Sequence, residues 1–347
     1  IMVSVMLVAV LFDRRALTIR AVALAALIVL ALRPEVLTGP GFQMSFAATT
    51  ALIAVFSALR NTTLWRWHPI LRWGVALVVS SAVAGLATAP VAAAHFNRVP
   101  HYGLIANLLS VPLMGAVVMP AAVLSALLAP LGLGWIGLAI MRPAIEWILG
   151  VAHWVAALDG AVSHVPAPPP AVLPLIALGG LFVILWQGRT RWIGTLPAAL
   201  AFLIWASAER PDVLIAGDAG LIGVMGREGR ALSKPRGNGF SAQSWLENDG
   251  DPVDQATAAA RMSGQSGVAD PFDLGNGIRI AHIFGRDAEN RLKTACAEAA
   301  LIIAALDQAT ACPAIDRRLL RETGPLALYI ENGTIRVETA RQRTGSR

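Results

Sequence analysis

Long apolar runs alternate with short polar breaks over the first 208 residues of the chain. A membrane-spanning helix needs about 20 mainly apolar residues, and eight stretches come close enough to be candidates. They are 1–12, 17–32, 42–59, 73–94, 102–128, 135–157, 172–187 and 192–207. The pattern therefore predicts a polytopic α-helical membrane domain over residues 1–208.

The stretch 102–128 is too long for one straight span. Pro112 and Pro120 divide it, and Pro130 follows it closely. Proline interrupts the hydrogen bonds of a helix and kinks or ends it. A kinked helix, a re-entrant pair and two separate spans all fit this pattern.

The pattern changes after residue 208, where short alternating runs and Gly/Pro breaks replace the long apolar ones. We predict strands over 212–217, 221–226, 278–284, 301–306, 326–330 and 334–338, and helices over 240–248, 287–297 and 315–323. Asn332 and Gly333 are a strong hairpin signal between the last two strands. Residues 209–347 should thus form a soluble α/β (α+β) domain with its own core.

Charge is distributed unevenly between the two halves. The chain is 56% hydrophobic and only 14% charged, against about 25% charged for a typical soluble domain. Residues 1–208 hold 11 arginines and four acids, whereas 209–347 hold 17 basic and 18 acidic residues. The high pI therefore comes from the membrane half, where it reflects topology more readily than phosphate binding.

Arginine placement predicts the orientation. The loops 13–20, 60–72 and 188–192 carry eight of the 11 arginines, so they should face the cytoplasm. With 102–128 counted as one excursion, the loops 33–41, 95–101 and 158–171 face outward. The soluble domain then lies outside the cytoplasm, attached to a multi-pass membrane domain.

Several polar residues stand inside or beside the apolar runs. Gln43 and Ser45 follow a Gly/Pro break, where they either bond a neighbouring helix or line a translocation path. Asn107 either bonds a neighbouring helix or a carbonyl freed by Pro112, or faces a pore. Arg98 lies in a polar turn that is either an ordinary solvated loop or an outward mouth that meets phosphate.

Arg142 and Glu146 are spaced i, i+4 within an apolar run, so each is the other's expected partner. Ionisable residues at membrane depth are functional candidates. The pair is either a structural ion pair or a part of the substrate path or its gate.

Cys296 and Cys312 are the only cysteines, and we expect a disulfide between them because their domain is placed outside the cytoplasm. Such a bridge stabilises by roughly 3 kcal/mol in the chain-entropy model. Two cysteines without further thiols or nearby histidine are a poor zinc signal, and no metal or cofactor is expected. Asp218 reads as a turn residue between two strands.

Five short elements occur in a fixed order. Residues 41–47 read G-F-Q-M-S-F-A and residues 106–113 read A-N-L-L-S-V-P-L. P-D-V-L-I-A-G-D follows at 211–218, then W-L at 245–246 with D-G-D at 249–251, then I-D-R-R at 315–318 with L-A-L-Y at 326–329. Together these elements resemble the ComEC family of competence proteins, the inner-membrane channels for DNA uptake in transformable bacteria.

Two departures from that family pattern matter. The family's N-terminal OB-like domain is absent, so we expect this chain to be a fragment of a longer protein. Many members also end in a metallo-β-lactamase-like domain with an H-x-H-x-D-H metal motif. Residues 209–347 contain one histidine, His282, which cannot supply a dinuclear site. The resemblance therefore implies a degenerate domain of that fold, and a transport protein without nuclease activity.

The resemblance implies a channel that takes up single-stranded DNA across the inner membrane during natural transformation. Its partners would be single-stranded DNA, membrane lipid, an external DNA receptor and a cytoplasmic helicase-like motor. A separate motor is expected because no G-x-x-x-x-G-K-[ST] nucleotide loop is present. The alternatives are a small-solute permease or exporter with an appended domain, and a membrane-tethered hydrolase.

Overall fold

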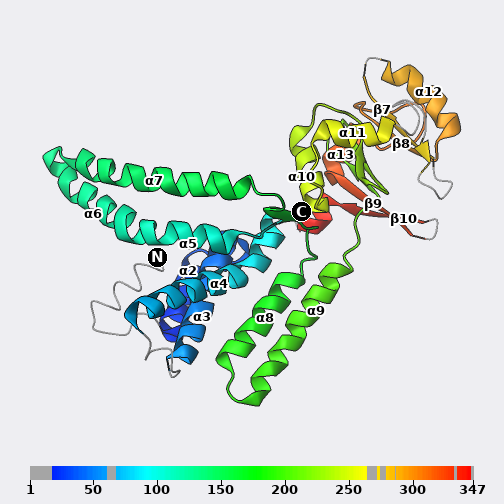
Figure 1. Cartoon of the computed structure of the whole chain (residues 1–347). Helices are drawn as coiled ribbons and strands as arrows, with labels where there is room; N and C mark the ends of the chain where they lie inside the picture. Colours follow the sequence, from blue (N-terminus) through cyan, green and yellow to red (C-terminus); the bar gives the residue numbers. More distant parts are fainter. Residues whose placement is uncertain are drawn as a thin grey trace. The chain divides into compact units, whose positions relative to one another are not determined.

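The computed structural model describes residues 18–60, 68–263, 272–273, 279–285, 287–331 and 334–344. The chain forms two compact units (Figure 1). One unit, here called the helical unit, spans Ile1–Ser163 and Pro168–Trp205. The other, the sheet unit, spans His164–Ala167 and Ala206–Arg347. The segment His164–Ala167 thus belongs with the later residues, although it precedes the last two apolar stretches in sequence.

The helical unit is built from apolar helices whose starts follow local sequence rules. They are α2 (Ile19–Leu32), α3 (Pro40–Leu59), α4 (Pro69–Phe96), α5 (Gly103–Leu113), α6 (Met119–Leu128), α7 (Gly134–Ala156), α8 (Val172–Leu185) and α9 (Thr195–Ala206). Pro40 and Pro69 each occupy the first helical position, where the missing N–H costs nothing. Asn97 ends α4 in the left-handed conformation.

Four of the described helices are long and apolar enough to cross a membrane: Pro40–Leu59, Pro69–Phe96, Gly103–Leu131 and Gly134–Ala156. The prediction of about eight spanning segments is not supported. The stretches 17–32, 172–187 and 192–207 form helices of 14, 14 and 12 residues, too short for a straight span. The candidate 1–12 lies outside the described residues.

The stretch 102–128 is one continuous helical path with a wider turn in the middle. A π-helical segment, Met114–Val118, joins α5 to α6, and Met119 N–H bonds to the carbonyl of Met114. Pro120 follows directly and cannot donate to an i−4 carbonyl. The π turn absorbs the break that prolines would otherwise make, so the kinked-helix alternative describes this region.

Close helix packing in the helical unit depends on glycine. A Cβ on Gly137 of α7 would lie 2.5 Å from the carbonyl oxygen of Ala121 in α6. A Cβ on Gly179 of α8 would lie 2.5 Å from the carbonyl oxygen of Gly194. Small residues at such contacts let membrane helices approach each other closely.

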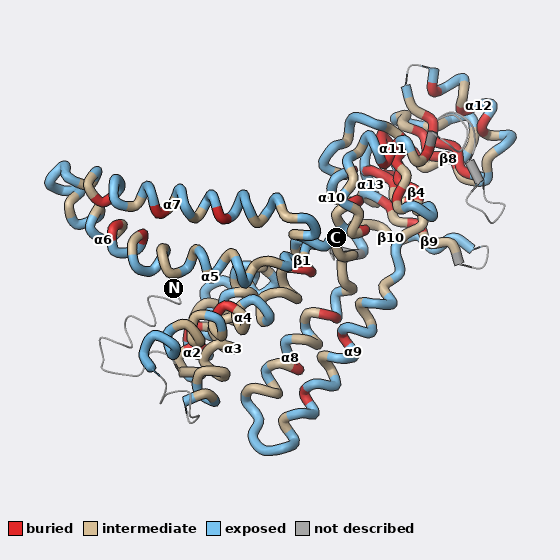
Figure 2. The backbone as a smooth tube through the Cα atoms, in the orientation of Figure 1, coloured by how far each residue is buried: buried red, intermediate tan, exposed pale blue. Residues whose placement is uncertain are grey.

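Burial differs between the two units. Figure 2 shows mostly exposed and intermediate positions along the helices of the helical unit, and many buried positions in the sheet unit. Large apolar side chains such as Leu27, Leu86 and Leu127 point outward from the helices. A lipid environment satisfies such a surface, whereas water would not. The chain is therefore a membrane protein with a separate sheet-containing domain.

The described residues of the sheet unit form two sheets. The first has the order β10-β9-β3-β4-β5 with antiparallel neighbours, formed by β3 (Val213–Ile215), β4 (Ile222–Gly226), β5 (Gly229–Leu232), β9 (Leu326–Glu331) and β10 (Thr334–Thr339). The second has the order β6-β7-β8, formed by β6 (Phe272–Asp273), β7 (Arg279–Ile283) and β8 (Leu301–Ala304). Strands β7 and β8 are parallel and are joined through α12 (Ala288–Glu298).

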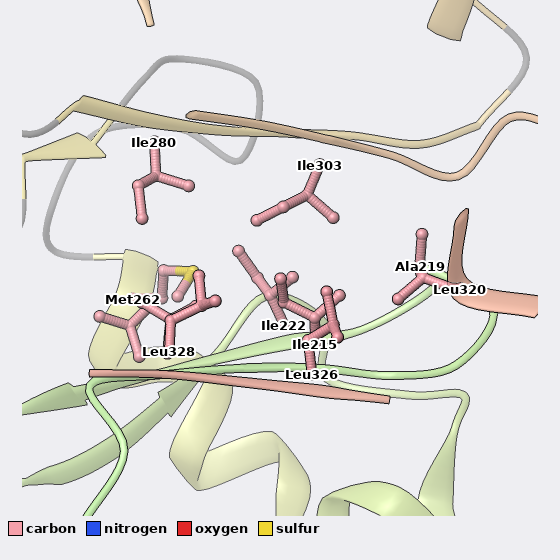
Figure 3. Close-up of a cluster of buried hydrophobic side chains, with 11 residues drawn as sticks. Ile215, Ala219, Ile222, Met262, Ile280, Ile303, Leu320, Leu326 and Leu328 are labelled. Atoms are coloured by element: carbon pink, nitrogen blue, oxygen red, sulfur yellow. The ribbon is translucent and has the colours of Figure 1, made fainter. Parts of the chain in front are cut away.

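The two sheets pack face to face around the main core. Ile280 and Ile303 of the second sheet face Ile215, Ile222 and Leu328 of the first (Figure 3). Alternate residues of each strand turn to the outer faces. There α12 covers the second sheet, while α10 (Gly239–Asp249) and α11 (Gln255–Ser263) pack against the first. The layer order is therefore helix, sheet, sheet, helix.

The predicted strands and helices of this unit are confirmed, with their boundaries within two residues of the predicted ones. Strands β9 and β10 pair antiparallel, as the predicted hairpin requires. The hairpin turn itself, residues 332–333, lies outside the described residues. Strands β5 and β6 and helices α11 and α14 (Ala340–Thr344) were not predicted from the sequence.

Candidate functional site

The first polar contact in the helical unit joins the start of α3 to the end of α4. Gln43 Oε1 lies 2.9 Å from His95 Nε2, and Gln43 Nε2 donates to the carbonyl of Leu37 at 3.0 Å. Leu37 belongs to the short helix Pro34–Thr38 that precedes α3. Gln43 therefore makes the interhelical hydrogen bond that was one of its two predicted roles.

A second group of polar contacts joins the turn after α4 to the segment after α7. His101 Nε2 lies 2.6 Å from Ser163 Oγ, and Tyr102 Oη donates to the carbonyl of Asp159 at 3.3 Å. The backbone N–H of His101 also donates to the carbonyl of Ala161 at 3.0 Å. Beside these contacts, β1 (Arg98–Pro100) pairs with β2 (Val162–His164).

These contacts bring three loops to one end of the helices. Residues 33–43, 95–102 and 158–163 are connected through Gln43, His95 and His101, and we call this region the loop end. The distribution of arginines predicts that the loops 33–41, 95–101 and 158–171 lie on a common face. The geometry of the loop end fits that grouping.

The other predicted polar residues do not take part in these four side-chain hydrogen bonds. Arg98 is exposed at the first position of β1. Ser45 is exposed one turn into α3, and its carbonyl accepts a hydrogen bond from Thr49 Oγ1 at 2.8 Å. Asn107 is exposed on α5. The structure does not bring Arg98, Ser45 and Asn107 together into one site.

Arg142 and Glu146 form an ion pair in the middle of α7. Arg142 Nε donates to Glu146 Oε1 at 2.8 Å, and the two side chains are 80% and 61% exposed. The 23-residue helix around them is otherwise strongly apolar. Placing exposed charges in contact with lipid at membrane depth costs free energy, even when the charges are paired. The face of α7 that carries Arg142 and Glu146 should therefore contact water or protein.

A tryptophan beside this pair connects α7 to α5. Trp147 Nε1 donates to the carbonyl of Leu109 at 3.2 Å. Leu109 lies three residues before Pro112, where the backbone hydrogen bonds of α5 are interrupted. The helix carrying the ion pair is thus tied to the helix carrying Asn107. This contact could not be predicted from the sequence, because an indole N–H in a membrane segment gives no sign of its acceptor.

A buried ion pair organises the outer layer of the sheet unit. Arg230 of β5 donates from Nε to Asp249 Oδ2 at 2.5 Å and from Nη2 to Asp249 Oδ1 at 3.1 Å, and its side chain is fully buried. Arg230 also donates to the carbonyls of Gly223 and Pro211. Asp251 binds Arg261 of α11. Thus the D-G-D element at 249–251 anchors α10 and α11 to the first sheet.

A polar cluster forms around the turn between β3 and β4. Asn238 Nδ2 donates to both carboxylate oxygens of Asp218 at 2.9 Å, and the N–H of Gly220 donates to Oδ1. Burial alone would raise the pKa of Asp218, but these hydrogen bonds outweigh it and hold the pKa below its usual value. Arg317 Nε donates to the Asp218 carbonyl at 3.0 Å. Asp218 is therefore a turn residue.

His282 lies beneath the same turn and is buried. Its Nε2 lies 2.9 Å from the carbonyl of Ala219, which adopts a positive φ. Burial lowers the pKa of His282 to about 4. Nδ1 has no hydrogen-bond partner among the described residues. His282 therefore supports the turn as a neutral ring.

The metal centre of the metallo-β-lactamase-like domains does not fit the residues present. A dinuclear site needs several histidine and carboxylate ligands together. His282 is the one histidine of residues 209–347. In the described part of the chain, no three His, Cys, Asp or Glu side chains gather as a metal centre requires.

The two cysteines are brought together at the edge of the second sheet. Cys296 near the end of α12 and Cys312 in the loop after β8 form a disulfide, with their Cα atoms 6.0 Å apart. Both pack against the core between α12 and the second sheet. The disulfide holds this loop against α12.

Comparison with known proteins identifies the helical unit. A family model described as Competence protein matches residues 1–190, more than half of the chain. No curated protein and no solved structure matches the chain. The matched range includes the loop end, Asn107 and the Arg142–Glu146 pair.

Proposed function

The chain belongs to the competence protein family, and on that basis we propose that it forms a channel through which single-stranded DNA crosses the inner membrane during natural transformation. The activity is transport, and the driving force comes from partners. A strand that crosses a membrane needs a wet path whose polar and cationic groups replace the hydration of the phosphates.

The Arg142–Glu146 pair is the observation that carries this proposal. The pair lies half-way along a spanning helix and is exposed. In a passive anchor, this position would hold an apolar residue. The guanidinium of Arg142 can bind a phosphate, and the neighbouring carboxylate of Glu146 partly balances its charge. Binding is then weak enough for the strand to leave again.

The loop end is the proposed mouth of the path. Its polar residues Gln43, His95 and His101 join three loops at one end of the helices. The arginine distribution favours an outward position for these loops, where incoming DNA would arrive. The disulfide supports the same orientation for the sheet unit, since disulfides persist outside the cytoplasm.

The sheet unit would then be an extracytoplasmic domain without nuclease activity. Its layers follow the order helix, sheet, sheet, helix, and we propose that it is a degenerate metallo-β-lactamase-like domain. Purified protein with Mn²⁺ or Zn²⁺ should leave linear DNA intact, and robust cleavage would overturn this part of the proposal. An external DNA receptor and a cytoplasmic helicase-like motor complete the proposed machinery.

Site-specific photo-cross-linking tests the path itself. Leu138 lies one turn before Arg142 on the same stripe of α7, whereas Ile140 lies about 200° around the helix. Both are apolar and exposed, at 56% and 45%. A benzophenone side chain at 138 should capture labelled incoming DNA in competent cells, and one at 140 should not. Equal capture at both positions, or capture only at 140, would contradict the proposed path.

A further inference from the structure

One aromatic side chain is more exposed than any other large apolar side chain described in the sheet unit. Phe240, in the first turn of α10, is 89% exposed, whereas the other exposed large apolar side chains of that unit, Leu319, Ile335 and Val337, reach at most 47%. Phe240 follows a loop that carries Lys234 and Arg236. A phenyl ring fully in water has no role in the core of this unit.

The backbone around Phe240 is held in place from two sides. Gln255 Nε2 donates to the carbonyls of Lys234 and Gly237, at 3.1 and 2.7 Å. Asn238, at positive φ, is fixed by its bonds to Asp218. The ring is therefore presented from an ordered turn, and binding to it would cost little ordering entropy.

Cationic side chains gather at the same turn. Arg317 of α13 (Arg317–Thr323) bonds to the carbonyl of Asp218, and Asp218 is also the partner of Asn238. Lys234 Nζ lies 4.2 Å above the ring of Phe284. Arg236 is exposed and engages no partner among the described residues. The carboxylate of Asp218 is satisfied by Asn238 and Gly220, and the exposed Asp307 lies 3.9 Å from Arg317 Nη1 in a loose ion pair that a phosphate can displace.

We propose that this surface, formed by Lys234, Arg236, Phe240 and Arg317, binds single-stranded nucleic acid. A base stacks on Phe240, and the neighbouring phosphates contact the arginines. Stacking platforms beside cationic groups are the general means of binding single strands without sequence preference. The proposal deepens the proposed function and rests on it for the source of the strand, which is incoming DNA.

The surroundings of Phe240 favour nucleic acid over a membrane surface. Insertion into lipid needs a broad apolar face. The residues next to Phe240 in sequence are Asn238, Gly239 and Ser241, and the apolar side chains of the loop and the first turn of α10 are otherwise limited to Pro235 and the buried Ala242. One ring with cations around it suits a single base and its phosphates.

The test uses the full chain in nanodiscs of zwitterionic lipid and a fluorescent 20-nucleotide oligo-dT, read by anisotropy at several salt concentrations. Phe240→Ala should weaken binding at least about fivefold and leave the salt dependence unchanged. Arg236→Ala should reduce the slope of log K against log salt by about 0.7, the value for one phosphate of a single strand. Phe240→Trp should retain binding.

Arg227→Ala is the matched control. Arg227 is exposed in the turn between β4 and β5, at the end of β4 opposite to the Asp218 turn. The Arg227→Ala chain should bind oligo-dT with the same affinity and the same dependence on salt as the unaltered chain. Equal binding by the Phe240→Ala and unaltered chains would overturn the proposal. Protection of residues 233–240 from hydrogen exchange by phosphatidylglycerol in the disc, but not by oligo-dT, would overturn it in favour of a lipid contact.

Failure of this proposal can be separated from failure of the proposed function. Oligo-dT binding that depends on Phe240 would stand even if deletion of the gene left transformation unchanged. Conversely, loss of transformation on deletion, together with oligo-dT binding indifferent to Phe240 and Arg236, would support the channel and reject this surface.

Discussion

The side-chain amide of Gln43 reaches His95 across two helices, with Oε1 and Nε2 2.9 Å apart. Because Gln43 Nε2 already donates to the Leu37 carbonyl, Oε1 is the acceptor, and His95 carries its proton on Nε2. This contact fixes the entrance of α3 against the end of α4. It also turns the Gly/Pro break at 39–41 into an ordered part of the loop end.

Replacing Gln43 by leucine should loosen this junction. Interhelical hydrogen bonds in membranes contribute about 1 kcal/mol to stability. The free energy of unfolding of the Gln43→Leu chain should therefore be lower by about that amount, so the chain should unfold at a lower SDS concentration. Unfolding in increasing SDS, followed by circular dichroism, measures the difference. Ser45→Ala is the control and should unfold like the unaltered chain. A Gln43→Leu chain as stable as this control would contradict the assigned role.

Neutralising one member of the Arg142–Glu146 pair should impair uptake more than exchanging both. Arg142→Gln leaves Glu146 unpaired in the proposed path, where its charge repels phosphate, and we expect transformation to fall at least about tenfold. The double exchange, Arg142→Glu with Glu146→Arg, keeps both charges and should recover part of the loss. Transformation frequency with linear marked DNA is the measurement. Normal transformation by the single variants would show that the pair is only structural.

Removing Asp249 should destabilise the sheet unit strongly. Breaking a buried ion pair leaves an uncompensated charge and costs about 3–5 kcal/mol. Asp249→Ala should therefore lower the urea midpoint of the unit, measured by pulse proteolysis of the full chain. Glu338→Ala removes a partly exposed pair with Arg336 and should cost below about 1 kcal/mol. Similar losses in the two variants would contradict the importance of burial.

The disulfide makes a prediction about both stability and location. Breaking it by Cys312→Ser should cost about 3 kcal/mol, the chain-entropy value for a loop of this length. In intact cells, a maleimide–polyethylene glycol reagent should add to Cys296 and Cys312 only after reduction. Labelling without a reductant would show free thiols and contradict the disulfide, whereas no labelling even after reduction would argue against an extracytoplasmic sheet unit.

Acid should weaken the sheet unit through His282. Its pKa is about 4 in the folded protein and about 6.5 when unfolded, so the unfolded chain binds the proton more readily between these values. Stability is then complete above pH 6.5 and falls as the pH drops toward 4, by roughly 3 kcal/mol at most. Hydrogen exchange of β7, corrected for the intrinsic rate, follows this loss. A His282→Gln chain should show a flatter dependence over the same range.

The sequence was most informative where one periodicity dominates. Local pattern alone predicts the long apolar runs of α3, α4 and α7 and the short apolar runs of β4, β7 and β9. Helix α11 was missed because its sequence, Q-A-T-A-A-A-R-M-S, is short and its buried face consists of small alanines and a single methionine. Its start is set by Asp254, whose Oδ1 accepts from the N–H of Thr257 at 2.7 Å. That N-cap was the available signal.

Partners far apart in sequence could not be read from the chain. Arg142 and Glu146 were paired correctly because helical spacing makes neighbours of residues four apart. Gln43 with His95, and Arg230 with Asp249, are separated by 52 and 19 residues and depend on how the elements pack. Residue type indicated that Gln43 needed a partner, while only the fold supplied its identity.

Transformation of a deletion strain tests the central claim most directly. The strain receives linear DNA with a selectable marker, and DNA that reaches the cell surface is measured in parallel. The channel account predicts that transformants fall to the spontaneous background while surface DNA binding stays intact, and that the unaltered gene restores them. Unchanged transformation in the deletion strain would contradict the account.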